Sequence, residues 1–600
     1  MNKLLSYYQK ELSFLKKRGE EFSRKFPKIA RRLGYHHGLS QDPHIERLTE
    51  SFAFLSSRIH QRLDEDLPEV MEALLQNLAP QFLYKYPSSC IISIEPSHNA
   101  SGMTGICNVP SGTPVFSKNK LGTVCNFKTV YPLTIIPATI NEARLYYDKQ
   151  SSLWKIEVKL QFLDGVQCST DFIRFYLHGH ANLTGAIYTL MCSESDFTVL
   201  KKNDCILNNI KPDISCVGFE EHEISLPRMN NISYIHHLVL DYYSFSDKFS
   251  FFDIKFGDFV TFSSGESLTI TTFLKKTATR YTPEKIEKAI TGDIFRINCT
   301  PAVNLFMKKS EPLRLSGDKD EYQVTADLHC RGEVCIWSVQ KATLHRKENN
   351  SVKTIPLRPL FGMDHMIPEQ SDNIFWHCSY SRSGVGNEQS EENVYIRLTD
   401  DGGSKSEVLS GDVLSLDVIC TNGDLPSLIN NGDPAGDFDS DIPIAGLRIT
   451  ALTRPSTMHP AITLTGLNWR IISQLSLNHV LLSGTDGAKL LREMLFVYNY
   501  NNDPEITAFI GWIKELEVAP VSSRLPGLSP PVTARGIDIT VKLSQDAYMH
   551  PECFLFCSFL ERFLGLHAPV NSFTRVITMI ENEEHTRKVW PVRAGKLSWL

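Results

Sequence analysis

Two short motifs in this sequence could supply a serine nucleophile for acyl transfer. Ser316 begins an S-x-x-K pattern that ends at Lys319, and Ser371 begins an S-D-N triplet downstream. Enzymes of the β-lactamase type combine these two motifs with a K-T-G segment. This chain has no K-T-G, Ser316 lies in the turn-like run SGDKDEY, and a second S-x-x-K begins at Ser117. We therefore predict that neither serine is catalytic.

Three aspartates at alternate positions, Asp437, Asp439 and Asp441, resemble the start of a calcium-binding loop. An EF-hand loop also needs glycine at its sixth position and a bidentate acid at its twelfth. Ile442 and Arg448 occupy these two positions. We predict that the aspartates are solvated acids of a loop.

Histidines and cysteines give no stronger signal for a metal site. His178 and His180 would lie on one side of a strand, but no residue near them in sequence supplies a third ligand. Cys553 and Cys557 lack C-x-x-C spacing and are expected to be buried thiols of an apolar helix. The sequence also contains no H-E-x-x-H, G-x-S-x-G or P-loop motif. We predict that the chain holds no metal or cofactor and is not an enzyme.

Length, composition and charge are typical of a multidomain globular protein. The 600 residues predict three or four domains, and 42% of them are hydrophobic and 22% charged. With 62 basic and 68 acidic residues the net charge is −6, which argues against nucleic acid as the main partner. The 14 cysteines are spread singly and the N-terminus shows no secretory signal, so we expect reduced thiols in the cytoplasm. The charge-free stretch that comes nearest to a membrane span, residues 175–193, is too polar to cross a membrane.

The first 33 residues show a heptad pattern, which is typical of a helix that packs against another helix along its length. Pro27 predicts a bend, and the opposite face is basic, which favours solvent or an acidic partner over a membrane surface. Gly19 interrupts an otherwise apolar seam, which we predict binds a partner protein. The seam consists of Leu5, Tyr8, Leu12, Leu15, Phe22, Phe26, Ile29 and Leu33.

Two further helices are predicted in the first 80 residues. Asp42 and Pro43 form a start signal for the second helix, whose apolar stripe includes Phe52 and Leu55, and Pro80 ends the third. Three amphipathic helices could close into a bundle within the chain. Because the first helix is longer than the others can cover, we expect part of its seam to contact a partner chain. A closed intramolecular bundle is the alternative.

Beyond these helices the hydrophobic period changes to two. Residues 154–162, 414–420 and 537–543 alternate apolar and polar side chains, which predicts half-buried strands of antiparallel sheets. Residues 421–443 are rich in Gly, Pro, Asn and Asp and predict an exposed loop or a domain boundary. Helical spacing returns at 488–498 and 551–566.

These patterns predict a multidomain α+β fold with an N-terminal helical bundle, antiparallel β-rich domains and a mixed α+β C-terminal domain. We place a helical assembly region at 1–86, a β-rich α+β domain at 87–298, a β-sandwich-like domain at 299–430 and an α+β domain at 431–600.

Segments spread over almost the whole chain resemble, in the same order, the TssF family of baseplate subunits of the bacterial type VI secretion system. Each segment alone is a weak signal, and together they are specific. One departure is Ser246-Asp247, where we expect Pro-Glu, and it affects one turn. The segments are ELSFLKKRGEEF, FPKIARRLG, DPHIERLTESFAFL, LDEDLPEVMEALL, LDYYSFSDKFSFFDI, CTPAVNLFMKKSEPLRL, CTNGDLP, LTRPS, WRIISQLSLN, ERFLGLHAPVNSF and WPVRAG.

The resemblance implies a mechanical role. TssF is similar to the wedge proteins of contractile phage tails: two copies are expected to join one TssG, and these bind TssE and TssK around the VgrG spike. The platform then docks at the membrane complex and starts sheath assembly. We therefore expect TssG, a second TssF copy, TssK, TssE and VgrG as partners, with the sheath and the membrane complex contacted indirectly. The alternative is a free-standing β protein that binds a carbohydrate or a receptor, which leaves the N-terminal seam unexplained.

Overall fold

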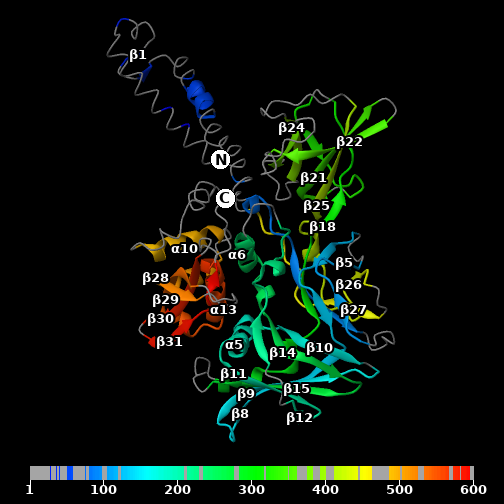
Figure 1. Ribbon diagram of the computed structural model, residues 1–600. Helices are drawn as coiled ribbons and strands as arrows, with labels where there is room; N and C mark the ends of the chain where they lie inside the picture. The colour runs from blue at the N-terminus through cyan, green and yellow to red at the C-terminus, as the bar shows by residue number, and fades with distance from the viewer. Residues whose placement is uncertain are drawn as a thin grey trace. The chain divides into compact units, whose positions relative to one another are not determined.

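The chain divides into two compact units, Met1–Ala79 and Pro80–Leu600 (Figure 1). Each unit is described by itself, and the domain boundaries expected inside the second remain a prediction. The computed structural model describes residues 8, 12, 28, 35, 36, 39, 40, 47, 50–58, 75, 80–96, 105–118, 123–165, 167–207, 212–228, 234–275, 283–316, 319–330, 332–348, 351–360, 374–382, 392–399, 411–442, 446–461, 486–499, 503–524, 533–565, 572–581 and 583–594.

The described residues of the first unit are mainly helical. A short hairpin pairs β1 (Tyr35–His36) with β2 (Leu39–Ser40) in antiparallel fashion. How the three predicted helices pack lies outside the described residues, so the structure does not support the N-terminal bundle and it stays a prediction. Helix is described at Tyr8, Leu12, Lys28, Arg47, 50–58 and Leu75.

Six strands from distant stretches of the second unit close into a barrel. Ile92 and Ile94 of one strand are fully buried inside it, and the rings of Phe127 and Phe438 meet edge to face with centroids 5.3 Å apart. Its core therefore depends on contacts between residues more than 300 positions apart. Around the barrel lie β17 (Cys299–Val303), β3 (Ser89–Pro96), β27 (Leu447–Ala451), β26 (Phe438–Ser440), β5 (Pro114–Ser117) and β6 (Asn126–Thr129).

Two further sheets contact each other where the rings of Phe162 and Phe262 stack with centroids 4.3 Å apart. The strand predicted at 154–162 is confirmed, because it pairs antiparallel with both neighbours and buries Ile156, Val158 and Leu160. The first sheet consists of β12 (Cys205–Ile206), β11 (Ser195–Lys202), β15 (Ser267–Leu274), β9 (Leu153–Phe162) and β8 (Ala138–Asp148). The second consists of β13 (Asp213–Cys216), β14 (Phe251–Phe262), β10 (Cys168–Leu177) and β16 (Phe295–Arg296), and the helices of this region are α5 (Ala181–Cys192) and α6 (Tyr234–Ser244).

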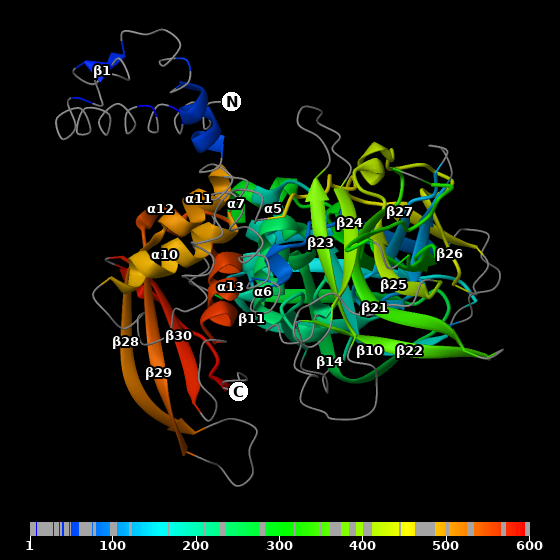
Figure 2. The same cartoon turned by 90° about the horizontal axis from the view of Figure 1, so that it is seen from above.

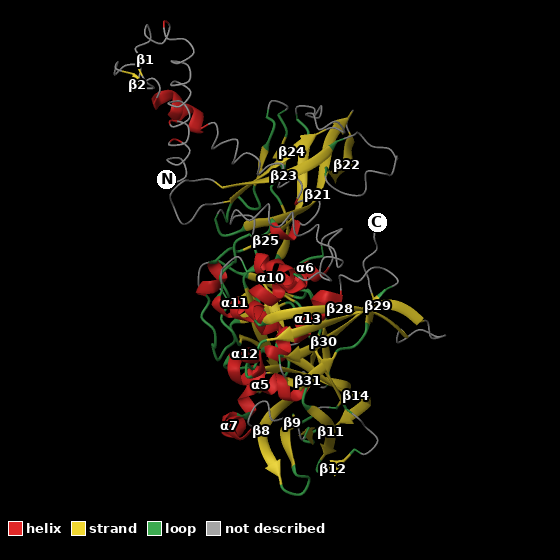
Figure 3. Ribbon diagram, turned by 90° about the vertical axis from the view of Figure 1, so that its left-hand side faces the viewer, coloured by secondary structure: helices red, strands yellow, loops and turns green. Residues whose placement is uncertain are grey.

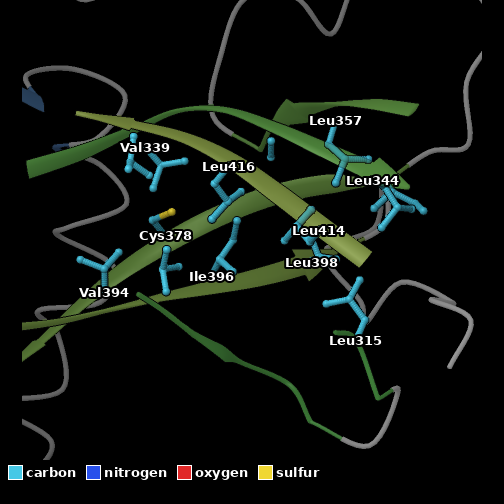
Figure 4. Packing of buried hydrophobic residues seen from close by; sticks show 14 of the residues in the cluster. Leu315, Val339, Leu344, Leu357, Cys378, Val394, Ile396, Leu398, Leu414 and Leu416 are labelled. Carbon is cyan, nitrogen blue, oxygen red and sulfur yellow. The ribbon is translucent and has the colours of Figure 1, made fainter. Parts of the chain in front are cut away.

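The strand predicted at 414–420 is also confirmed, as β25 of an eight-stranded sheet. Leu414, Leu416 and Val418 point into one apolar core, where they meet Leu344 and Ile396 from neighbouring strands (Figure 4). The sheet consists of β18 (Phe306–Lys309), β25 (Val413–Thr421), β21 (Cys335–Glu348), β22 (Ser351–Pro359), β23 (Phe375–Arg382), β24 (Glu392–Thr399) and β20 (Tyr322–Val324), with β19 (Leu313–Arg314) beside β25.

The C-terminal part is mixed α+β, as predicted (Figures 2 and 3). The helices expected at 488–498 and 551–566 are confirmed, and the second lies in the crossover between the parallel strands β29 and β30. The sheet consists of β28 (Ile513–Arg524), β29 (Thr533–Leu543), β30 (Phe573–Ile580), β31 (Glu583–Val589) and β32 (Arg593–Ala594). Its helices are α10 (Gly487–Tyr498), α11 (Pro504–Gly511), α12 (Gln545–Tyr548) and α13 (Cys553–Gly565).

Short elements connect these sheets. The strands β4 (Cys107–Val109) and β7 (Leu133–Ile135) form a two-stranded pair. The remaining elements are α7 (Pro283–Ile286), η1 (Pro80–Phe82), η2 (Glu221–Glu223), η3 (Ser246–Phe249), η4 (Glu287–Ala289), η5 (Gly292–Ile294) and η7 (Leu425–Leu428).

The prediction of one exposed loop or boundary at 421–443 is wrong near both ends of the segment, whereas its centre at 430–435 is mostly exposed. Phe438–Ser440 is the barrel strand β26, and Asn422 and Asp437 are almost fully buried. The many Gly, Pro and Asn residues bend the backbone here, but the polar side chains satisfy backbone groups inside the protein. High turn content alone therefore does not place a segment at the surface.

Candidate interaction surfaces

The predicted N-terminal seam lies largely outside the described residues. Tyr8 and Leu12 are helical, as expected, and both are partly exposed. Their partner-binding role stays a prediction. The other six seam residues, Leu5, Leu15, Phe22, Phe26, Ile29 and Leu33, fall outside the described part of the chain.

The helix at 50–58 turns large apolar side chains to solvent. Phe52 and Leu55, which belong to its predicted apolar stripe, are each 61% exposed, and Phe54 is 47% exposed. Ala53 and Ser57, four residues apart on another face, are completely buried. Thus the smaller side chains face the interior and three larger ones are uncovered. Apolar residues grouped in this way mark interaction surfaces. The heptad spacing identified the stripe but could not show that it stays exposed.

A buried ion pair lies in the segment 240–254, which carries part of the family resemblance. Asp241 on α6 contacts Lys248 on η3, and both side chains are 0% exposed. Asp241 also accepts hydrogen bonds from the Tyr86 hydroxyl at 2.9 Å and from the Ser225 backbone N–H at 3.1 Å. Lys248 donates a further bond to the Glu223 carbonyl at 2.9 Å. A buried pair persists when its remaining hydrogen-bonding capacity is satisfied in this way.

Glu223 and Tyr131 extend this network on either side. The Glu223 carboxylate accepts bonds from the backbone N–H groups of Gly218 at 2.7 Å and Glu220 at 3.0 Å, and the Tyr131 hydroxyl donates to the Lys248 carbonyl at 2.7 Å. Gly218 has φ +105°, and a Cβ there would lie 2.8 Å from the Tyr131 hydroxyl oxygen. Glycine is therefore needed at this position for both backbone conformation and space.

Two more family-like segments meet through asparagines. Asn304 Nδ2 donates to Asn422 Oδ1 at 2.9 Å, and the Asn422 backbone N–H returns a bond to Asn304 Oδ1 at 2.6 Å. Thr421 Oγ1 donates to the same Asn304 oxygen at 2.7 Å. These bonds hold the end of β25 beside the loop after β17.

A third cluster joins the C-terminal sheet to η2. Glu561 on α13 is almost fully buried and accepts a bond from Arg562 at 2.6 Å, while Arg593 on β32 contacts its other oxygen. Both arginines also lie 4.0 Å from Glu220, and the Arg562 guanidinium lies 4.7 Å from the Phe219 ring centroid. No local spacing signal marked these three clusters, because each also needs a partner distant in sequence, such as Arg593 for Glu561 or Tyr86 for Asp241. The quoted family-like segments contained them without showing that they meet.

The candidate chemical residues do not converge. Ser316 is exposed, with its backbone N–H bonded to the Tyr322 hydroxyl at 3.2 Å, and Ser371 lies outside the described residues. His178 follows the end of β10 and His180 precedes α5, so their predicted placement on one strand is wrong.

Asp439 and Asp441 are exposed, as predicted, but the expectation of a solvated acid is wrong for Asp437. Its carboxylate is 4% exposed and accepts bonds at 3.0 Å from the backbone N–H groups of Gly432, Asp433 and Ala451. It therefore stabilises the turn that leads into β26. In the described part of the chain, no three His, Cys, Asp or Glu side chains are placed to hold a metal ion. No described helix is both long and apolar enough to cross a membrane.

The described part of the chain combines extensive sheets with exposed apolar side chains and buried polar clusters. Comparisons with known proteins give its class as a component of the type VI secretion system. A family profile described as "Type VI secretion system, TssF" matches residues 1–597. The chain belongs to the TssF family. It is 25% identical to the type VI secretion system component TssF1 of Pseudomonas aeruginosa, over 96% of both sequences.

Two solved structures share the fold. One is a chain of the TssK-TssF-TssG baseplate subcomplex, with a TM-score of 0.70 and 21% identity, covering 92% of this chain and 99% of that chain. The other comes from the baseplate complex of the type VI secretion system, with a TM-score of 0.57 and 21% identity, covering 98% of this chain and all of that chain.

Proposed function

We propose that this protein is a structural wedge component of the type VI secretion baseplate. Two copies join one TssG, the resulting wedge binds TssK and TssE, and wedges assemble around the VgrG spike. The sheath and the inner-membrane complex are reached indirectly, from the cytoplasmic side. Support comes from family membership and from the shared fold with the solved TssK-TssF-TssG subcomplex.

The observation that carries this proposal is the uncovered apolar face of the N-terminal unit. Phe52, Phe54 and Leu55 contribute large side chains that this chain leaves exposed. Exposed aromatic and leucine side chains lose contact with water when a partner covers them, which contributes about 1.5–3 kcal/mol for each fully buried side chain. A scaffold that assembles through helices has a use for such a face, whereas a free-standing ligand-binding protein does not.

Co-expression with TssG followed by size-exclusion chromatography and mass measurement tests this proposal. We expect a complex with two copies of this chain and one of TssG. A chain that stays monomeric beside TssG and binds a carbohydrate or a receptor instead would favour the free-standing β protein.

Phe52→Ser with Leu55→Ser is expected to weaken the complex at least tenfold without lowering the stability of the isolated chain. Exposed substitutions usually change the free energy of unfolding by less than about 0.5 kcal/mol, whereas central apolar interface residues contribute about 2 kcal/mol each. Binding is measured by titration with TssG. Phe259→Ser with Val352→Ser, at exposed positions of the second unit, is the matched control. Wild-type affinity of the Phe52/Leu55 variant would contradict a role of this face.

A mechanical role also predicts that the candidate nucleophiles are dispensable. Ser316→Ala, Ser371→Ala, and His178→Ala with His180→Ala should leave sheath assembly and killing of competitor bacteria near wild type. Loss of a true nucleophile would lower activity by orders of magnitude. Sheath growth is followed by fluorescence in cells. A stable, normally expressed serine variant that cannot support sheath growth would contradict the non-enzymatic role.

A further inference from the structure

One cavity of the second unit collects carboxylates that have no counter-ion among the described residues. Its volume is about 190 Å³, and it lies between the end of β10, the start of α5, the end of α6, η3, α11 and the segment before α13. Asp247, Glu505 and Glu552 line it. Among the described residues that line the cavity there is no lysine, arginine or histidine, and none of these three carboxylates has an ion-pair partner in the described part of the chain.

The carboxylates lie close enough to oppose one another's charge. Desolvation of its carboxyl group by the surrounding protein raises the pKa of Asp247, although the residue as a whole stays exposed. The pKa of Glu552 is raised by burial and, to a smaller extent, by the negative charges of Glu505 and Asp247. A fourth acid in the lining, Asp503, is occupied as the N-cap of α11, where it accepts the Glu505 backbone N–H at 2.9 Å. Asp503 is itself acidic and supplies no positive charge, so the lining stays acidic.

Two tyrosines in the same lining supply hydroxyl groups that the described residues leave without a partner. Tyr176 is 3% and Tyr242 5% exposed, and neither hydroxyl has a hydrogen-bond partner among the described residues. Each lies near one of the carboxylates, because Asp247 contributes to the raised pKa of Tyr176 and Glu552 to that of Tyr242. Neither hydroxyl oxygen belongs to the fully buried side-chain atoms that lack a partner, so both open into the cavity, where they can accept a hydrogen bond from a group that enters it.

The chemistry of the lining selects the ligand. Carboxylates and tyrosine rings together suit a planar cation that donates several hydrogen bonds and stacks on aromatic faces, which describes a guanidinium better than a compact ammonium. A metal ion fits less well. Among the described residues, these acids included, no three His, Cys, Asp or Glu side chains are placed to hold a metal ion. Asp247 and Glu505 are also still exposed at the mouth of the cavity, which leaves room for the stem of a side chain to enter from outside.

We propose that this cavity binds the guanidinium group of an arginine presented by a partner protein. The identification of a protein as the source rests on the assembly role proposed above. The residues that line the cavity all belong to the second unit. If Phe52 and Leu55 prove not to bind TssG, that result therefore does not contradict the arginine site.

The test is calorimetric titration of the full chain with the peptide acetyl-Gly-Arg-Gly-amide. Two peptides serve as ligand controls: one with citrulline, a neutral analogue, and one with lysine. We expect both to bind at least tenfold more weakly than the arginine peptide. Equal binding of citrulline would overturn the ionic site, equal binding of lysine would overturn the guanidinium assignment, and absence of binding by the arginine peptide would overturn the proposal.

Paired variants locate the binding. Asp247→Asn with Glu552→Gln should weaken binding of the arginine peptide at least tenfold. Asp258→Asn with Glu287→Gln, which changes two exposed acids outside the cavity, should leave the affinity for this peptide unchanged. A raised carboxylate pKa means that the charged form is unfavourable to the fold at neutral pH, so the cavity variant should also melt at a higher temperature than wild type. Unchanged affinity of the cavity variant would overturn the site. A lower melting temperature would show that the carboxylates stabilise the fold, and would overturn the proposal that they are kept for a ligand.

Discussion

Replacing Leu12 and Leu15 together by aspartate is expected to abolish binding of TssG while the sheets of the second unit stay folded. Both residues belong to the predicted heptad seam, and Leu12 is helical and partly exposed in the structure. Placing two carboxylates in a helix interface costs several kcal/mol, even when their pKa values rise. A loss of about 5 kcal/mol of binding free energy would weaken binding several thousandfold. At micromolar protein concentrations, the peak of the complex should then be absent from size-exclusion chromatography.

The matched control adds the same two charges outside the seam. In the helix predicted from the heptad pattern, Ser6 and Ser13 occupy positions outside the seam, so TssG should still bind the variant Ser6→Asp with Ser13→Asp. Circular dichroism of both variants checks that the strand content is unchanged. If Leu12→Asp with Leu15→Asp forms the complex normally, the seam is closed within the chain and the intramolecular three-helix bundle is correct.

Lys248→Met is expected to destabilise the second unit by about 3–5 kcal/mol, because it leaves the Asp241 carboxylate buried without its cation. Methionine keeps an unbranched apolar side chain in the place of the lysine stem, so lost packing contributes little. The substitution also removes the bond to the Glu223 carbonyl. Urea unfolding followed by tryptophan fluorescence measures the effect as a lower midpoint.

An exposed ion pair supplies the control for Lys248→Met. Arg448 and Glu95 lie 2.6 Å apart with side chains 42% and 33% exposed, so Arg448→Met should cost less than about 1 kcal/mol. In the double variant Lys248→Met with Asp241→Asn, the unpaired charge is gone, and the loss should be smaller than the sum of the two single losses. A wild-type midpoint for Lys248→Met would show that the buried pair does not hold α6 and η3 together.

Local patterns of the sequence predicted the elements that depend on local spacing. The alternation at 154–162 predicted β9, and the apolar spacing at 551–566 predicted α13, because a side chain's face follows from its position along the strand or helix. The family resemblance, carried by short segments in a fixed order, predicted the class of protein. None of these inferences required knowing which distant residues meet.

Contacts between distant residues were decided by the tertiary structure alone. The barrel closes because β27 pairs with β3, and the ion pair at Asp241 is completed by Tyr86, 155 positions away. Asp437 was expected to be solvated and is buried, because backbone N–H groups of its own turn and of Ala451 replace water around its carboxylate.

The same reason separates the two candidate surfaces. The apolar residues of the N-terminal helices could be found from their spacing, since a helix repeats its face every three or four positions. The acidic cavity could not, because Asp247, Glu505 and Glu552 come together only when η3, α11 and the segment before α13 pack around one space. Which residues share a helix or strand face is a property of the sequence. Which charges share a cavity depends on packing, since burial and the distances between charges exist only in the folded chain.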